Sequence, residues 1–286
     1  RRDLFTRTLS RRYDVSAALS SDVAGEFTQE VGRVYKRVSA WLTFVVKYRL
    51  NSLLLATALA TIAALALLFG GRRLFGDFIE PDPTETEPTY LSRLSLALFS
   101  TLIPSLSIGV FLVSTYYFLD YFSLLRSDIA PLLWSLFSVI LLVYFVYRLA
   151  RAILAPRRPN WRLLPVRSQA AQWLLVLAVF TAVSTGFDYF MDQVYSLFGS
   201  QLSLTVATSL VATVIVGLLI MAIGGVSPLD DEEGRPKQWP LKFRYLLFAL
   251  GAAIIVAAML GYIGFARFLS QQAVVTGAIV ATMYIG

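Results

Sequence analysis

Long apolar segments separated by short polar links follow one another along the chain from residue 50 onward. Each segment holds about 20 residues, the length that a helix needs to cross a hydrocarbon core of about 30 Å. We therefore predict an all-α, polytopic integral membrane helix bundle without a soluble catalytic domain. It should have about seven transmembrane helices, with spans near residues 50–69, 94–118, 131–147, 170–190, 204–223, 245–265 and 273–286.

Residues 1–49 follow a different pattern and form a basic amphipathic juxtamembrane segment ahead of the bundle at 50–286. Between residues 27 and 46 the apolar positions recur at steps of three and four, and Lys and Arg occupy other positions, which predicts an amphipathic helix. Trp41 lies on its apolar face. Two interpretations stay open: a helix in the lipid headgroup layer, or a helix packed on neighbouring protein.

The composition supports a membrane protein and excludes several kinds of site. The chain is 57% hydrophobic and only 15% charged, far from the balance of soluble domains. It contains no Cys and no His, so disulfides, thiolate or imidazole metal sites and Ser-His-Asp catalysis are excluded. Two acidic clusters, at 77–87 and 230–233, lack the alternating ligand spacing of a calcium loop and are predicted to be solvated loops. We expect no enzyme, no metal and no cofactor.

Lys and Arg in the links predict the orientation. Links one, three and five carry 13 of these residues and the other three carry 2, so the positive-inside rule places the former in the cytoplasm. Arg158 and Arg162 should then face the cytoplasm, Asp188 and Asp192 the outside. The segment ahead of the first span is outside as well, and its ten basic residues are expected to belong to an exported domain of a longer protein.

The third link is the most basic. Its position at a membrane face makes anionic lipid headgroups the expected partner rather than nucleic acid, and each basic residue there contributes about 1 kcal/mol. With Trp41, the candidates for lipid or interface contact are Arg157, Arg158, Trp161 and Arg162.

Three features lie inside the predicted spans. Pro104 removes one backbone hydrogen bond near Ser100 and is expected to kink the second span. No charged residue lies in the middle third of any span, which argues against ion-coupled transport. Small residues at steps of four are candidates for close helix packing: Ala56, Ala60 and Ala64 in the first span, and Ala253, Ala257 and Gly261 in the sixth.

Three strings carry a resemblance to a known family: LLPVRSQAA at 163–171, VSTGFD at 183–188 and FLSQQAVVTG at 268–277. They resemble the extra N-terminal membrane region of large bacterial mechanosensitive channels of the small-conductance (MscS-like) family. The resemblance implies a homo-oligomer in the bacterial inner membrane. It also implies a peripheral, tension-sensing role, with the pore helix and cytoplasmic domain in parts of the protein beyond residue 286. An accessory or scaffold subunit and a secondary transporter are the alternatives.

Overall fold

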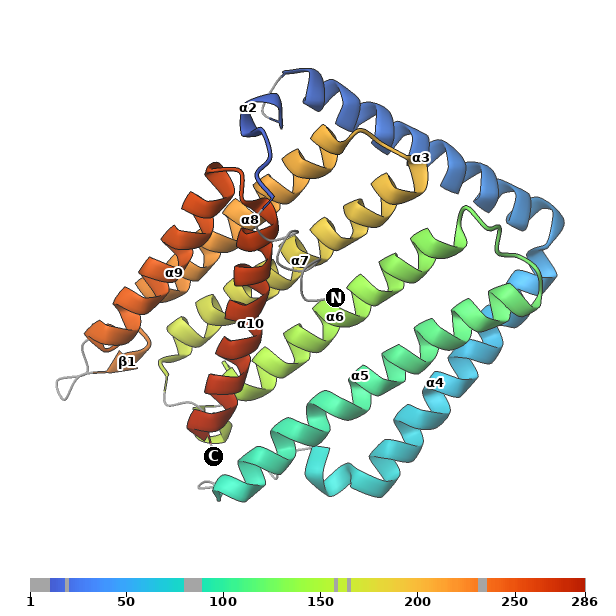
Figure 1. The fold of residues 1–286 in the computed structure, drawn as a ribbon. Coiled ribbons are helices and arrows are strands. Elements are labelled where there is room, and N and C mark those ends of the chain that lie inside the picture. The colour runs from blue at the N-terminus through green and yellow to red at the C-terminus, as the bar shows by residue number, and fades with distance from the viewer. Residues whose placement is uncertain are drawn as a thin grey trace. The chain divides into compact units, whose positions relative to one another are not determined.

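The computed structural model describes residues 11–18, 21–79, 89–156, 159–163, 166–230 and 236–285. Nearly all of these residues are helical (Figure 1). The helices are α2 Val15–Ala18, α3 Ser21–Tyr48, α4 Leu50–Ile79, α5 Tyr90–Tyr121, α6 Ala130–Leu154, η1 Pro159–Trp161, α7 Ser168–Phe198, α8 Leu202–Gly225, α9 Leu241–Met259 and α10 Ile263–Ile285. Strands β1 Leu229–Asp230 and β2 Pro236–Lys237 form a small antiparallel pair between α8 and α9.

The prediction of a polytopic, all-helical membrane fold is confirmed. Within the described ranges, six helices are long and apolar enough to cross a membrane: Leu50–Leu74, Tyr90–Tyr121, Ala130–Leu154, Ser168–Phe198, Leu202–Gly225 and Leu241–Met259. The segment predicted as a seventh span, from residue 273, lies in the second half of α10.

The predicted border between the last two spans is wrong. The sixth span was expected to continue to residue 265, but α9 ends at Met259 and the chain turns through Leu260–Tyr262. Gly261 makes this turn possible because its φ is +90°, a conformation that other residues rarely adopt. Helix α10 then begins at Ile263, about ten residues before the predicted start, so the expected polar link is helical.

The chain divides into two compact units, Thr28–Leu163 and Arg1–Phe27 with Leu164–Gly286. We call them the α3–α6 unit and the α7–α10 unit after their long helices, although α3 begins in the second and continues in the first. Each is described by itself.

In the α3–α6 unit, helix α5 packs against α4 on one side and α6 on the other, as Figure 1 shows. Helices α4 and α6 share at most a marginal contact. In the most apolar 18-residue stretch of each helix, only 11% of the residues of α4 and 11% of those of α6 are buried, against 33% of those of α5. The three helices therefore form a layer one helix thick, in which most residues of α4 are exposed and most residues of α6 are half-buried.

Helix α3 confirms the predicted amphipathic helix and decides between the two interpretations for Trp41. The Trp41 side chain is only 6% exposed, and its Nε1 donates a hydrogen bond of 2.8 Å to the Leu124 carbonyl in the α5–α6 turn. Val45 is fully buried in the same cluster, with Ala56 from α4. Trp41 is therefore packed on protein and is not an interface residue. Val31, Leu42 and Val46 remain exposed along α3.

In the α7–α10 unit, α8 is the central helix and contacts α7, α9 and α10. Its closest approach is to α9, at two glycines. A Cβ atom added to Gly251 would lie 2.7 Å from the Gly217 carbonyl oxygen, and one added to Gly217 would lie 3.1 Å from the Gly251 oxygen. Real Cβ atoms do not approach other atoms to 2.7 Å, so Gly251 allows this crossing of backbones.

The predicted rows of small residues are only partly correct. Ala56 and Ala60 are fully buried, whereas Ala64 is partly exposed. In α9 the rotation of the helix turns a different face to α8: Gly251, Ile254 and Ala258 are buried, Ala257 is half-buried and Ala253 is exposed. Gly261, the third member of that predicted row, belongs to the α9–α10 turn and not to a helix.

Candidate functional site

A buried carboxylate connects three helices of the α7–α10 unit. Asp188 on α7 is 5% exposed. Its Oδ1 accepts a hydrogen bond of 2.7 Å from the Ser209 hydroxyl on α8, and its Oδ2 lies 2.9 Å from Nε of Arg267 on α10. Asp192, one turn further along α7, lies 3.8 Å from the Arg267 guanidinium and is 40% exposed at its side chain. These four residues are called the Asp188 site.

Asp188 lies two residues before the end of the span predicted at 170–190 and ten residues before the end of α7. Helix α7 has 31 residues and is about 46 Å long, against a hydrocarbon core of about 30 Å. If the helix is centred, its end extends about 8 Å beyond the core, and Asp188, ten residues from that end, lies about 7 Å inside. A carboxylate at such a depth is costly without partners, and the Asp188 site supplies two.

Asp188 and Asp192 were predicted only to face the outside, and Arg267 was expected in the link between the spans at 245–265 and 273–286. Because α10 begins at Ile263, Arg267 is helical and lies next to Asp188. The sequence did contain a sign of this contact. The fourth and sixth links are both predicted to face the outside, so Asp188, Asp192 and Arg267 are expected on the same side of the membrane.

A second polar contact connects two helices of the α3–α6 unit, and it originates in Pro104. Helix α5 continues without a break through Pro104. Because proline has no amide hydrogen, the Ser100 carbonyl, four residues earlier, lacks its helical donor. The Arg148 guanidinium on α6 donates a hydrogen bond to this carbonyl, and the Thr101 hydroxyl lies 3.5 Å from the Arg148 carbonyl. The carbonyl that Pro104 leaves without a helical donor is thus the acceptor for Arg148. The kink itself stays a prediction.

This contact predicts coupling between Pro104 and Arg148. In Pro104→Ala the restored amide can donate to the Ser100 carbonyl, so Arg148 contributes less. We expect Arg148→Met to cost about 2 kcal/mol in the wild type and about 1 kcal/mol less in the Pro104→Ala background. Thermal unfolding in micelles measures both values. The control is Arg151→Met, an exposed residue on the same helix, which should be nearly neutral in both backgrounds. Equal losses for Arg148→Met would contradict the assignment.

The basic link after α6 differs from the prediction where it is described. Arg162 is 7% exposed, and its guanidinium lies 3.5 Å from the Ala155 carbonyl, so it contacts the loop itself. Burial lowers the pKa of Arg162 from its ordinary value. Trp161, at the end of η1, is half-buried. The side chains of Arg157 and Arg158 lie outside the described residues.

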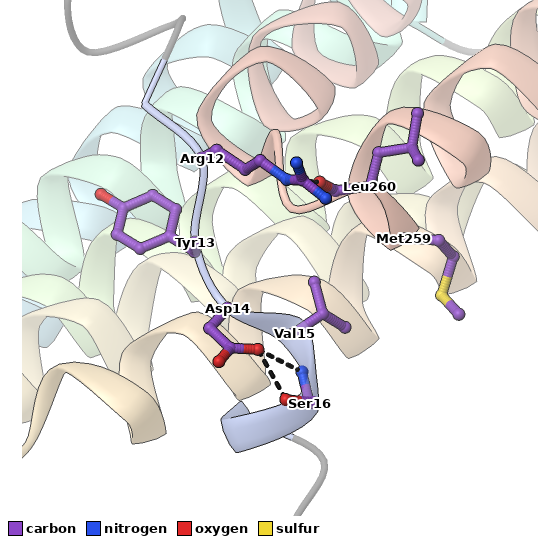
Figure 2. A pocket seen from close by; sticks show the side chains of 7 residues that line it. All are labelled: Arg12, Tyr13, Asp14, Val15, Ser16, Met259 and Leu260. Carbon is purple, nitrogen blue, oxygen red and sulfur yellow. Dashed lines mark hydrogen bonds between the residues drawn. The ribbon is translucent and has the colours of Figure 1, made fainter.

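A pocket of about 450 Å³ lies at the C-terminal end of α9 (Figure 2). The N-terminal segment forms one wall: the Tyr13 amide donates to the Gly261 carbonyl, and Arg12 Nε donates to the Leu260 carbonyl at 3.1 Å. The Asp14 carboxylate accepts from the backbone amide and the hydroxyl of Ser16 (Figure 2). These polar groups anchor the segment to the end of a helix, and a cation suits that position electrostatically. We assign the pocket a structural role.

These sites contain no arrangement for metal binding. Among the residues that the structure describes, no three acidic side chains lie close enough together to hold a metal ion. The carboxylate oxygens of Asp188 are both engaged, and the site offers the chemistry of a contact between helices.

Comparison with known proteins adds no assignment: no protein-family model, no curated protein and no solved structure matches the chain. The resemblance of three short strings to MscS-like channels therefore stays a prediction, and function has to be argued from the helices themselves.

Proposed function

We propose that this chain is the peripheral, tension-responsive transmembrane region of a mechanosensitive channel subunit. The observation that carries the proposal is the single layer of α4, α5 and α6: only 11% of the residues in the most apolar stretches of α4 and α6 are buried, and the others are half-buried or exposed. Membrane tension does work in proportion to the change in area within the membrane plane. A layer exposed to lipid on both faces changes its area when its helices tilt or separate, without opening a packed core.

Helix α3 provides a route for tension to reach this layer. Leu42 and Val46 are 44% and 51% exposed, so this stretch of α3 carries an apolar surface suited to the headgroup boundary. Trp41 and Val45, on the neighbouring positions, hold α3 to the α5–α6 turn. A displacement of α3 in the interface would therefore move the end of the layer. We propose the bacterial inner membrane as the location, residues ahead of α4 on its outer side, and lipids and further copies of the chain as partners.

The response of the layer to tension can be measured in this Cys-free chain. Spin labels at Leu55→Cys on α4 and Leu142→Cys on α6 report the width of the layer, and both positions are exposed. We expect the distance distribution to shift when lysophosphatidylcholine is added to one leaflet, because it mimics tension. The control pair, Val211→Cys on α8 and Val256→Cys on α9, should not shift because glycine contacts hold these helices together. No shift in the first pair would contradict the proposal and favour a scaffold subunit.

The channel itself is tested on the complete protein that carries this chain. Patches from proteoliposomes should show a conductance that opens with suction, and its threshold should change in Leu42→Glu, which makes the exposed face of α3 polar. Leu42 is a better position for this test than Val38, which packs against the buried cluster. A complete absence of tension-dependent current, in patches shown to contain inserted protein, would exclude the channel and leave an accessory role.

One observation favours a second function, ion-coupled transport. No charged residue lies in the middle third of a predicted span, but the Asp188–Arg267 pair would lie about 7 Å inside the core if α7 is centred in the membrane. A coupled transporter requires such a group to exchange a proton or cation during turnover. Uptake driven by an imposed proton or sodium gradient, abolished in Asp188→Asn, would establish transport over the tension-responsive role.

A further inference from the structure

Two exposed tyrosines lie near one end of the α3–α6 unit. Tyr117 and Tyr121, one turn apart on α5, are 60% and 70% exposed, and their stacked rings have centroids 6.4 Å apart. Asp120 next to them is exposed as well, whereas Leu119 is buried in the cluster that contains Trp41. Tyrosines that combine an apolar ring with a polar hydroxyl are typical of the boundary between hydrocarbon and headgroups. We call Tyr117 and Tyr121 the tyrosine pair.

Arginines lie at a common level near the other end of the unit. On α4, the arginines at 72–73 follow Gly71, and a Cβ added to Gly71 would lie 2.8 Å from the Ile103 side chain on α5. On α6, Arg148 donates a hydrogen bond to the Ser100 carbonyl of α5. Since Ser100 and Ile103 are less than one turn apart, these three arginines share one level along α5. We call it the arginine level.

The tyrosine pair and the arginine level are about 30 Å apart, and three helices give this distance separately. The buried cluster beside the tyrosine pair contains Leu119 and Ile129, and Leu53 of α4 packs against it. From this cluster to the arginine level we count 20 residues on α4, 18 on α5 and 19 on α6: Leu53 to Arg73, Leu119 to Thr101 and Ile129 to Arg148. These intervals correspond to about 27 to 30 Å of helix, the thickness of a hydrocarbon core.

The alternative is a position in which α5 is centred in the membrane. Its 32 residues measure about 48 Å, so Ser100 would then lie about 6 Å inside the core. Arg148 would lie at the same depth, where a guanidinium is costly. The Ser100 carbonyl does not satisfy this group, because Nε of Arg148 is buried without a hydrogen-bond partner among the described residues. A boundary at the arginine level avoids that cost.

From these distances we infer that the tyrosine pair binds the headgroup boundary of one leaflet, while the arginine level lies at the boundary of the other. The α3–α6 unit then crosses the core between Tyr121 and Thr101, and residues 90–99 of α5 extend about 15 Å beyond it. No free charge is required, because an arginine ends an apolar span whether or not it is paired. The inference does not depend on the channel proposal, since any membrane role would allow it.

The test measures depth in vesicles of phosphatidylcholine and phosphatidylglycerol. Nitroxide labels are placed singly at Leu98→Cys, Leu106→Cys and Val113→Cys, three exposed positions of α5, and their collisions with oxygen and with a nickel chelate give the depth. We expect Val113 to be deepest, about 3 Å from the midplane, with Leu106 at about 7 Å and Leu98 about 4 Å outside the core. A label at Leu106 as deep as Val113 or deeper, with Leu98 inside the core, would establish the centred position and overturn the inference.

The role of the tyrosine pair is tested by Tyr117→Ala with Tyr121→Ala. Without the pair, the apolar length of α5 determines its position, so the Leu98 label should move inward by several ångströms, toward the centred position. Tyr90→Ala is the matched control: this exposed tyrosine lies at the opposite end of α5, beyond the arginine level, and its loss should leave the depth unchanged. An unmoved Leu98 label in a double variant with wild-type helix content by circular dichroism, or an equal movement in Tyr90→Ala, would overturn the assignment.

Discussion

Replacing Asp188 by Asn is expected to lower the free energy of unfolding by about 2 to 3 kcal/mol. The substitution removes the negative charge 2.9 Å from the Arg267 guanidinium and leaves only the more exposed Asp192 carboxylate, at 3.8 Å, to balance it. Arg267→Gln should produce a loss of similar size, since it leaves the 5% exposed carboxylate with only the Ser209 hydroxyl. The double variant should lose less than the sum of the two.

The measurement is a double-mutant cycle by denaturant or thermal unfolding in one detergent, with a coupling energy of at least about 1 kcal/mol expected between positions 188 and 267. Asp192→Asn is the matched control on the same helix: its carboxylate is 40% exposed and 3.8 Å from Arg267, so solvent screens the interaction and the expected change is under about 0.5 kcal/mol. Additive losses at 188 and 267, or equal losses at 188 and 192, would show that the pair does not hold α7 to α10.

Length and apolarity along the chain were sufficient to predict the membrane-spanning helices, because these properties are read from consecutive residues. The amphipathic helix α3 was predictable for the same reason. The turn at Leu260–Tyr262 was not, since its Gly261 lies within an apolar run with no charge or proline to mark an end. That one turn moved the start of α10 and carried Arg267 from a link into a helix, which is why the Asp188 site was missed.

Contacts between distant residues were beyond the sequence. Trp41 donates a hydrogen bond to the Leu124 carbonyl, 83 residues away in the sequence. Arg148 donates to the Ser100 carbonyl, 48 residues away, which has no helical donor because of Pro104. The pattern could say that Trp41 lies on an apolar face but not what covers that face. Arg162 shows the same limit for charge, because its basic link predicts a location in the cytoplasm but not the burial of one guanidinium.

The α8–α9 contact could have been predicted from glycines spaced seven residues apart, but only small residues at steps of four were considered. Gly217 and Gly224 are seven residues apart and therefore on one face of α8. A Cβ at Gly224 would lie 3.2 Å from Leu247 Cβ on α9, so both glycines face the same helix. The face of α9 that packs against these glycines depends on the rotation of α9 about its axis. In the structure this face contains Gly251 and not Ala253.

Gly251→Leu is expected to produce the largest loss of stability of any single substitution proposed, about 3 kcal/mol or more. The first added carbon would already lie 2.7 Å from the Gly217 carbonyl oxygen, which belongs to the backbone and cannot turn aside. Helices α8 and α9 would have to separate, with loss of packing around Val216, Ile220 and Ile254. Thermal unfolding followed by circular dichroism in micelles measures the loss, and Gly70→Leu, in open space on α4, should leave the midpoint nearly unchanged.

The pair of glycines also allows the cause to be tested. In Gly217→Ala the closest contact of the new carbon is the Ile255 side chain, at 2.7 Å, so Ile255→Ala should restore part of the lost stability. In Gly251→Ala the contacts are Met221 Cγ at 2.5 Å and the Gly217 oxygen at 2.7 Å. Met221→Ala removes only the first of these, so we expect little rescue. Equal rescue in both cases would mean that side chains, and not the approach of two backbones, set the distance between α8 and α9.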